Sequence, residues 1–215
     1  MRTPIMKKIP KIIHQIWLGE NPKPAKLMQT WKDKHPDFKF IEWNNKSITK
    51  IAWKCKAQLD QMLMVKRYNG AADILRYEIL HEFGGFVAPA DRICVNPIDD
   101  LLEFGCFCCY ENEKERRNLL SPIIGTAPGN ELMNFLIETI KNSPDVLYDD
   151  AWKVTGNALL TGAVQKTNYP IVILPSYTFL PEHYTGENYQ GEGKIYSRHF
   201  WGSTKQITDK FDEQI

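Results

Sequence analysis

The sequence predicts a single α/β domain with a mostly parallel central sheet flanked by helices. Apolar runs of strand length alternate with segments whose apolar residues recur at helical spacing along nearly the whole chain. No internal repeat or low-complexity linker interrupts this alternation, and 215 residues are enough to bury a large core without disulfides or metals. Such sheets bind ligands at the carboxyl ends of their strands, so residues that follow strands are candidates for a functional site.

The first elements follow from apolar runs and from the breaks between them. The run KIIHQIWL ends at Gly19, which predicts a buried strand, and the two prolines of ENPKP precede a helical pattern. Asn69 and Gly70 are expected to break the chain before the next helix begins. The elements expected before that break are strands over 11–18 and 38–43 and helices over 25–34 and 47–65.

The stretch AADILRYEILHEFGG is expected to be a helix followed by a sharp reversal. Its apolar residues form one stripe, and Asp73 and Arg76 lie together on another side at positions i and i+3. Gly84 can end the helix because glycine adopts positive φ at no steric cost, and Gly85 allows the backbone to pass close to another segment. We expect this helix over 71–83.

The residues that follow predict a short strand and a carboxylate at its exit. The run 86–88 is apolar, and Pro89 prevents it from continuing as a central strand because proline has no N–H to donate. Asp91 is therefore expected where a strand leaves the sheet. Apolar runs and helical spacing then predict strands around 106–110 and 122–126, helices over 130–141 and 157–165, and a strand over 171–174.

Composition excludes several classes of function. The chain has 27 basic and 26 acidic residues with no basic block, so we expect no nucleic-acid partner. No apolar run reaches the roughly 18 to 20 residues that a membrane span requires, and the N-terminus lacks a signal-peptide core, so we expect a soluble protein. Three of the five cysteines lie in the run GCFCCYE, without the spacing of a zinc site, and are expected to be buried free thiols in a reducing compartment.

Five blocks of this sequence, in order and spacing, resemble the family 32 glycosyltransferases, sugar transferases with a DXD motif. The blocks are IPKIIHQIWLG, AADILRYEILHEFGGF followed by a carboxylate, IIGTAPGNELMNFL, TGNALLTGAV and RHFWGS. The resemblance extends from Ile9 to Ser203 and implies the GT-A fold as a single domain. We expect that domain over 1–205, with 206–215 as a tail or the start of a linker.

The resemblance implies a donor site at the end of the first strand and along the helix before the glycine pair. Trp17 would stack on the nucleotide base, although a core tryptophan is an alternative. Asp73 and Arg76 would contact the donor sugar and its phosphate, although a surface ion pair is an alternative. The donor-binding residues that it implies are Ile16, Trp17, Leu18, Asp73, Arg76, Tyr77, Ala90, Asn157, His199 and Ser203.

The chain departs from the family at the DXD motif. Where the family has GGxYxDxD, Pro89 replaces the first Asp and Val87 replaces the Tyr, so only Asp91 remains. The resemblance implies a divalent metal, Mn²⁺ or Mg²⁺, bound by Asp91, His199 and Ser203 together with two diphosphate oxygens. For His199, a histidine packed among aromatic residues is an alternative. We expect metal-dependent transfer with altered sugar recognition.

By resemblance, the chain is expected to be a glycosyltransferase in which Asp73, Arg76 and Asp91 carry catalysis. It would move a hexose or deoxyhexose from a nucleotide diphosphate sugar, UDP favoured over GDP, to a glycan or protein-linked acceptor, with retention of configuration. The alternatives are an inactive protein that binds nucleotide sugars and a lectin-like module. We expect a cytoplasmic location, in bacteria or in the host of a virus, and the chain could be part of a longer multidomain protein.

Overall fold

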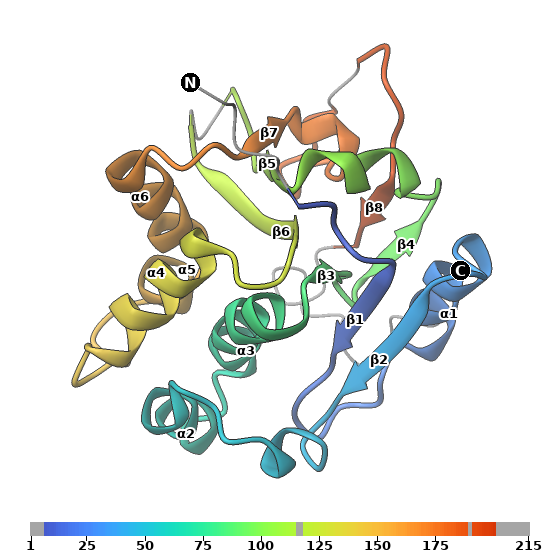
Figure 1. The fold of residues 1–215 in the computed structure, drawn as a ribbon. Coiled ribbons are helices and arrows are strands. Elements are labelled where there is room, and N and C mark those ends of the chain that lie inside the picture. Colours follow the sequence, from blue (N-terminus) through green and yellow to red (C-terminus); the bar gives the residue numbers. More distant parts are fainter. Residues whose placement is uncertain (1–6, 115–117, 189–190, 201–215) are drawn as a thin grey trace.

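A computed structural model describes residues 7–114, 118–188 and 191–200, so Ser203 and the expected tail over 206–215 lie outside the described residues. Within these ranges the chain forms a six-stranded sheet in the order β2-β1-β3-β6-β5-β7 (Figure 1). The strands are β1 (Ile12–Ile16), β2 (Lys39–Trp43), β3 (Gly85–Val87), β5 (Cys106–Tyr110), β6 (Leu120–Thr126) and β7 (Val172–Leu174). The predicted α/β class with a mostly parallel sheet is confirmed.

Only β6 runs against the other strands of this sheet. The pairs β1–β2, β1–β3 and β5–β7 are parallel, while β6 is antiparallel to both β3 and β5. The strands β1, β2, β3, β5 and β7 therefore end at one edge, which we call the carboxyl edge.

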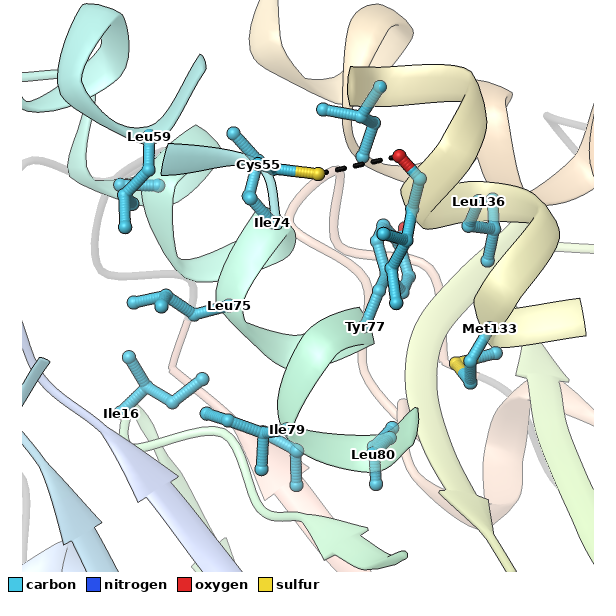
Figure 2. Packing of buried hydrophobic residues seen from close by; sticks show 14 of the residues in the cluster. Ile16, Cys55, Leu59, Ile74, Leu75, Tyr77, Ile79, Leu80, Met133 and Leu136 are labelled. Atoms are coloured by element: carbon cyan, nitrogen blue, oxygen red, sulfur yellow. Dashed lines mark hydrogen bonds between the residues drawn. The ribbon is translucent and has the colours of Figure 1, made fainter. Parts of the chain in front are cut away.

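Helices cover both faces of the sheet. A large apolar cluster joins one face to α2, α3, α4 and α6, and a second cluster joins the other face to α1 and the 3₁₀ helices η2 and η3. Figure 2 shows side chains of the first cluster between α3, β1 and α4. The α-helices are α1 (Ala25–Lys34), α2 (Lys56–Met64), α3 (Tyr68–Phe83), α4 (Glu131–Lys141), α5 (Ala151–Val154) and α6 (Asn157–Thr167). The 3₁₀ helices are η1 (Ile48–Lys50), η2 (Asp99–Phe104) and η3 (Ser176–Thr178).

The glycine pair after α3 takes the sharp reversal that the sequence predicts. Both residues have positive φ, +63° at Gly84 and +94° at Gly85. A Cβ at Gly85 would lie 2.5 Å from the carbonyl oxygen of Ile12, so only glycine lets β3 approach β1 this closely. His14 of β1 fixes the same junction, because its Nε2 donates to the carbonyl of Gly84 at 2.9 Å while its Nδ1 accepts from Nε1 of Trp43 at 3.2 Å. The reversal therefore sets where the segment after β3 leaves the sheet.

A second sheet pairs β4 (Arg92–Cys94) with β8 (Ser197–His199), which the sequence did not predict. The two strands are antiparallel, and Arg92 lies opposite His199. This pairing brings the residues that follow Asp91 beside a segment more than one hundred residues later. The tail of the chain is thereby attached to the exit of β3.

Two predicted boundaries are wrong, both for tertiary reasons. The helix expected over 47–65 is interrupted between η1 and α2, because the carboxylate of Glu78 on α3 accepts the backbone N–H groups of Lys54 and Cys55, each at 2.7 Å. The expected break at Asn69 and Gly70 lies inside α3. A Cβ at Gly70 would lie 2.7 Å from Sδ of Met62, so this glycine serves the close contact between α2 and α3.

The predicted free thiols are confirmed, since all five cysteines are free and buried. Burial raises the pKa of these thiols, which keeps them in the protonated, unreactive form. The Cys55 thiol donates to the carbonyl of Ile137 at 3.4 Å (Figure 2). These cysteines fill the core.

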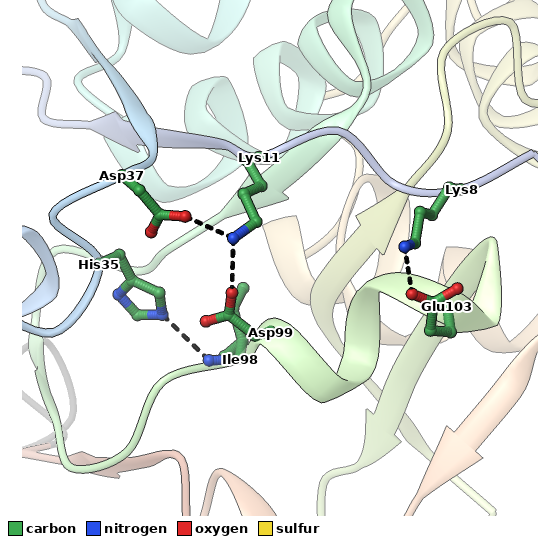
Figure 3. A network of polar contacts seen from close by, with 7 residues as sticks. All are labelled: Lys8, Lys11, His35, Asp37, Ile98, Asp99 and Glu103. Carbon is green, nitrogen blue, oxygen red and sulfur yellow. Dashed lines mark hydrogen bonds and ion pairs between the residues drawn. The ribbon is translucent and has the colours of Figure 1, made fainter.

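Charged residues close the edge of the sheet opposite the carboxyl edge. Lys11, just before β1, bonds Asp37 at 2.5 Å and Asp99 at 2.9 Å (Figure 3). Beside them, Nε2 of His35 accepts from the N–H of Ile98 at 3.0 Å. These contacts tie α1, β1 and η2 together and leave the carboxyl edge for the site.

Candidate functional site

A cavity of about 560 Å³ lies at the carboxyl edge, where β1 and β3 end. Three segments that are distant in sequence line it. They are the loop after β1, the first turns of α3 together with Lys66 just before that helix, and the exit of β3. The lining residues are Ile16, Trp17, Leu18, Glu20, Asn21, Lys66, Tyr68, Asn69, Ala72, Arg76, Val87, Ala88, Pro89, Ala90 and Asp91. Six of the eleven donor-binding and metal-binding residues expected from the sequence are among them, namely Ile16, Trp17, Leu18, Arg76, Ala90 and Asp91. Asp73 and His199 are bonded to two of these, Arg76 and Asp91.

Trp17 lies at the cavity and is only half-buried, whereas Ile16 and Leu18 on either side are buried. Its indole Nε1 donates to the carbonyl of Asn21 at 2.9 Å, which fixes the ring orientation while the ring remains partly exposed. A core tryptophan would be fully buried, as Trp31 is. Trp17 therefore offers an aromatic surface to the cavity.

Asp73 and Arg76 form an ion pair on α3 through Oδ1 and Nη1, and their side chains are only 13% and 12% exposed. They are not a surface pair. Thr155 also bonds Oδ2 of Asp73, at 3.5 Å. Burial raises the pKa of the Asp73 carboxyl, and the Arg76 guanidinium opposes this only in part.

The guanidinium of Arg76 lines the cavity and is incompletely satisfied by the protein. Its Nε is buried and has no hydrogen-bond partner among the described residues. Because a buried donor without a partner is costly, an oxygen-rich ligand beside this group would gain from it. Arg76 is thus held by Asp73 and directed to the cavity.

Asp91 and His199 are in direct contact at the exit of β3. Nε2 of His199 lies 2.7 Å from Oδ2 of Asp91. The His199 side chain is 12% exposed and the Asp91 side chain is 26% exposed. Burial alone would raise the pKa of the Asp91 carboxyl. The charge and the hydrogen bond of His199 outweigh this effect and lower the pKa to about 2. The carboxylate is therefore anionic at neutral pH and faces the cavity, beside Ala90 and the Pro89 that stands at the first DXD position.

Tyr77 and Asn157 do not line the cavity. Tyr77 is fully buried between α3 and α4 (Figure 2), and its hydroxyl donates to the carbonyl of Thr155 at 2.8 Å. The side-chain amide of Asn157 donates to the carboxylate of Glu111, a buried residue that follows β5. Tyr77 thus contacts the residue before Gly156 and Asn157 is the residue after it, and Gly156 itself packs against the Asp73 carboxylate.

The donor set fits a divalent metal in part. The structure brings together two of the three expected ligands, Asp91 and His199, and the third, Ser203, lies outside the described residues. Among the described residues no group of three or more His, Cys, Asp or Glu side chains could hold a metal by itself. A carboxylate and an imidazole suit Mn²⁺ or Mg²⁺ only when oxygen atoms of a ligand complete the coordination.

Sequence reasoning missed the first turn of α3. Tyr68, Ala72 and Arg76 all line the cavity, and their spacing of i, i+4 and i+8 places them on one face of the helix. The expected break at Asn69 and Gly70 concealed this pattern. A helix begun three residues earlier, at Tyr68, would have revealed it.

The chain is similar in sequence to known sugar transferases. Residues 22–108 match the family model described as the glycosyltransferase sugar-binding region containing the DXD motif. Inositol phosphoceramide mannosyltransferase 3 of Schizosaccharomyces pombe is 30% identical over 140 residues, which are 63% of this chain and 37% of that protein. Mannosyl phosphorylinositol ceramide synthase SUR1 of Saccharomyces cerevisiae is 28% identical over 152 residues, 67% of this chain and 36% of that protein. The chain thus spans little more than a third of the length of these relatives.

The fold itself also has a solved counterpart. The structure of PaToxG glycosyltransferase superposes with a TM-score of 0.63 at 20% identity and covers 75% of this chain and 70% of that one. This likeness shows that the fold is that of a GT-A glycosyltransferase. Residues 22–108 are thus similar in sequence to the sugar-binding region of DXD-containing glycosyltransferases, and the described residues have the fold of such an enzyme.

Proposed function

We propose that the chain is a glycosyltransferase that takes a hexose from a nucleotide diphosphate sugar. The observation that carries the proposal is the convergence of Trp17, Arg76 and Asp91, from three separate segments, on one cavity at the carboxyl edge. An aromatic surface, a cation and a carboxylate match the three parts of such a donor. These are its base, its diphosphate and the metal that accompanies the diphosphate.

Arg76 would stabilise the leaving group. As the anomeric C–O bond breaks, positive charge develops on the sugar ring and negative charge on the departing diphosphate. The ion pair with Asp73 fixes the orientation of the guanidinium toward the cavity. The remaining N–H donors of Arg76 can then bond phosphate or sugar oxygens. The buried position of the pair strengthens these interactions because water is excluded.

Asp91 would be the main protein ligand of a divalent metal, Mn²⁺ or Mg²⁺, supported by His199 and by Ser203. A bound divalent cation would neutralise diphosphate oxygens and so take the place of a general acid. In the structure His199 holds the Asp91 carboxylate through Nε2 and thereby orients it toward the cavity. The transfer would proceed with retention of configuration, which rests on the resemblance to family 32.

The names of the two relatives suggest the sugar and the acceptor. The first is named a mannosyltransferase of inositol phosphoceramide, and the second a synthase of mannosyl phosphorylinositol ceramide. We therefore propose mannose as the first sugar to test, with a hydroxyl of a glycan or glycolipid as the acceptor. No helix in the described ranges is long and apolar enough to cross a bilayer.

One observation favours a second candidate function, an inactive protein that binds nucleotide sugars. Pro89 stands where the first carboxylate of the DXD motif would be, and it lines the cavity. It offers no oxygen to ribose or sugar hydroxyls. Binding with no turnover of any donor would favour this candidate.

The experiment is a screen of UDP-sugars and GDP-sugars for hydrolysis, with Mn²⁺ or with a chelator, on the wild type and on Arg76→Lys. We expect release of nucleotide from at least one donor only with metal, and a loss of roughly 100-fold or more in Arg76→Lys, because a lysine cannot make the planar two-point contact. Glu103→Gln, in an exposed ion pair with Lys8 outside the cavity, is the matched control. A protein that binds glycans but no nucleotide would be lectin-like, and the proposal would be wrong.

A further inference from the structure

We infer that Glu20 and Lys66 recognise the edge of the donor's base and that their chemistry selects guanine. This inference rests on the proposed function, because it assumes that a nucleotide occupies the cavity. Stacking on Trp17 cannot choose the base, since every base has an aromatic face. The choice must come from polar groups at the same end of the cavity.

Four charged residues line the cavity, and they come from different parts of the chain. Arg76 and Asp91 form the pair assigned to the diphosphate and metal, while Glu20 and Lys66 are the other two charged residues among the lining positions. Glu20 follows Trp17 by three residues, and Lys66 precedes α3. Tyr68 and Arg76 are eight residues apart on this helix, a rise of about 12 Å. Glu20 and Lys66 therefore lie near the start of α3, about two helical turns from Arg76.

The loop that carries Glu20 is held in place by the protein. The side chain of Asn45 bonds both the N–H and the carbonyl of Gly19, at 3.0 Å and 2.9 Å. Gly19 has φ of +99°, and a Cβ there would lie 2.7 Å from the Tyr68 ring, so this loop packs directly against the start of α3. Glu20 is thereby presented toward Lys66, and their charged groups are 3.4 Å apart.

Lys66 adopts a backbone conformation that favours glycine. It follows the last turn of α2 with φ of +58°, and the N–H groups of Lys66 and Arg67 bond the carbonyls of Leu63 and Met62 at 3.1 Å and 2.9 Å. This is the usual end of a helix at a residue in the left-handed region, a position most often occupied by glycine. Lysine is disfavoured there because its Cβ crowds the carbonyl oxygen. The helix gains nothing from this side chain, whereas the cavity gains a cation.

The pair matches one base better than the others. Guanine presents two adjacent donors, N1–H and the N2 amino group, next to the acceptor O6. A carboxylate has two acceptor oxygens and an ammonium group has only donors, so Glu20 can accept from both guanine donors while Lys66 donates to O6. Uracil presents a single N–H between two carbonyl oxygens, and those oxygens would repel the carboxylate.

The test is a binding titration of GDP and UDP in excess Mg²⁺, followed by tryptophan fluorescence, on the wild type, Glu20→Gln and Lys66→Gly. We expect the wild type to prefer GDP by about tenfold or more, and Glu20→Gln to remove most of that preference, because glutamine supplies only one acceptor. Lys66→Gly should weaken GDP binding and yet raise the midpoint of thermal unfolding by about 1–4 °C, because glycine suits the left-handed backbone.

Matched controls separate local effects from general ones. Asn168→Gly replaces another non-glycine residue of positive φ, at the end of α6 and away from the cavity, and should raise the midpoint without changing either affinity. Glu103→Gln should change neither. Equal or tighter binding of UDP by the wild type, or an unchanged GDP preference in Glu20→Gln, would overturn the inference and leave the proposed function standing. Failure of both nucleotides to bind would overturn the proposed function as well.

Discussion

Protonation of His14 should loosen the junction that sets the exit of β3. His14 is fully buried, and both of its ring nitrogens are hydrogen-bonded. Nδ1 accepts from the indole N–H of Trp43, and Nε2 donates to the carbonyl of Gly84. A proton on Nδ1 would face the indole N–H. Burial lowers the pKa of His14 from 6.5 to about 4, outweighing the hydrogen bond to Gly84 that raises it.

The sign and size of the effect follow from this shift. Because the folded-state pKa lies below the unfolded one, the contribution to stability is complete above pH 6.5 and is lost as the pH falls toward 4. At pH 5 an unfolded His14 is nearly all protonated while the folded one is nearly all neutral. The free energy of unfolding should therefore be about 2 kcal/mol lower at pH 5 than at pH 8 from this residue alone.

Urea unfolding of the wild type and of His14→Gln between pH 8 and pH 5 measures this effect. Glutamine cannot titrate but still carries a donor and an acceptor, so its free energy of unfolding should change less with pH. Burial also lowers the pKa of His35, which adds to the slope of both proteins, so the difference between the two slopes isolates His14. Equal slopes in the two proteins would refute the reasoning.

Three further substitutions test the packing of the fold and the role of Trp17 at the cavity. Gly85→Ala should lower the free energy of unfolding by about 2 kcal/mol or more, because its Cβ would lie 2.5 Å from the carbonyl oxygen of Ile12 at a φ of +94°. Gly162→Ala, in α6 with nothing within 4 Å of the added Cβ, should raise it by about 0.5–1 kcal/mol, and a similar effect of both changes in urea unfolding would contradict the packing argument. Trp17→Ala should weaken nucleotide binding by about 1–3 kcal/mol in calorimetry, and unchanged affinity would show that the indole does not stack on the base.

Local patterns predicted those parts of the fold that local forces decide. The helix expected over 25–34 is α1 with the same bounds, because its apolar spacing and the prolines before it act within a few residues. The two roles assigned to Gly84 and Gly85, a reversal and a close approach of backbone, are both present. Such features need no knowledge of distant residues.

Features that depend on distant partners could not be predicted. The interruption before α2 exists because the carboxylate of Glu78, twenty-three residues beyond Cys55, accepts the backbone N–H groups of Lys54 and Cys55. The pairing of β4 with β8 joins segments of three residues each, too short to show a strand pattern. Gly70 lies inside a helix because Met62 packs against it, while the dipeptide alone is typical of a turn.

The candidate site divides in the same way. The resemblance placed Trp17 in the first block and Arg76 and Asp91 in the second, and the parallel order of β1 and β3 explains why they converge on one cavity. Tyr77 shares the helix with Arg76 but lies on its buried side. The place of Lys66 at the cavity could not be predicted, because it depends on a left-handed backbone conformation that no sequence pattern shows.

We propose that Asp91 links a divalent metal to a nucleotide diphosphate in this cavity. Calorimetric titration of GDP and UDP, with Mn²⁺ and with a chelator, on the wild type and on Asp91→Asn tests it most directly. We expect Mn²⁺ to strengthen nucleotide binding to the wild type by tenfold or more, about 1.4 kcal/mol, and Asp91→Asn to lose this gain while it still binds nucleotide weakly. The same gain in both proteins would contradict the claim.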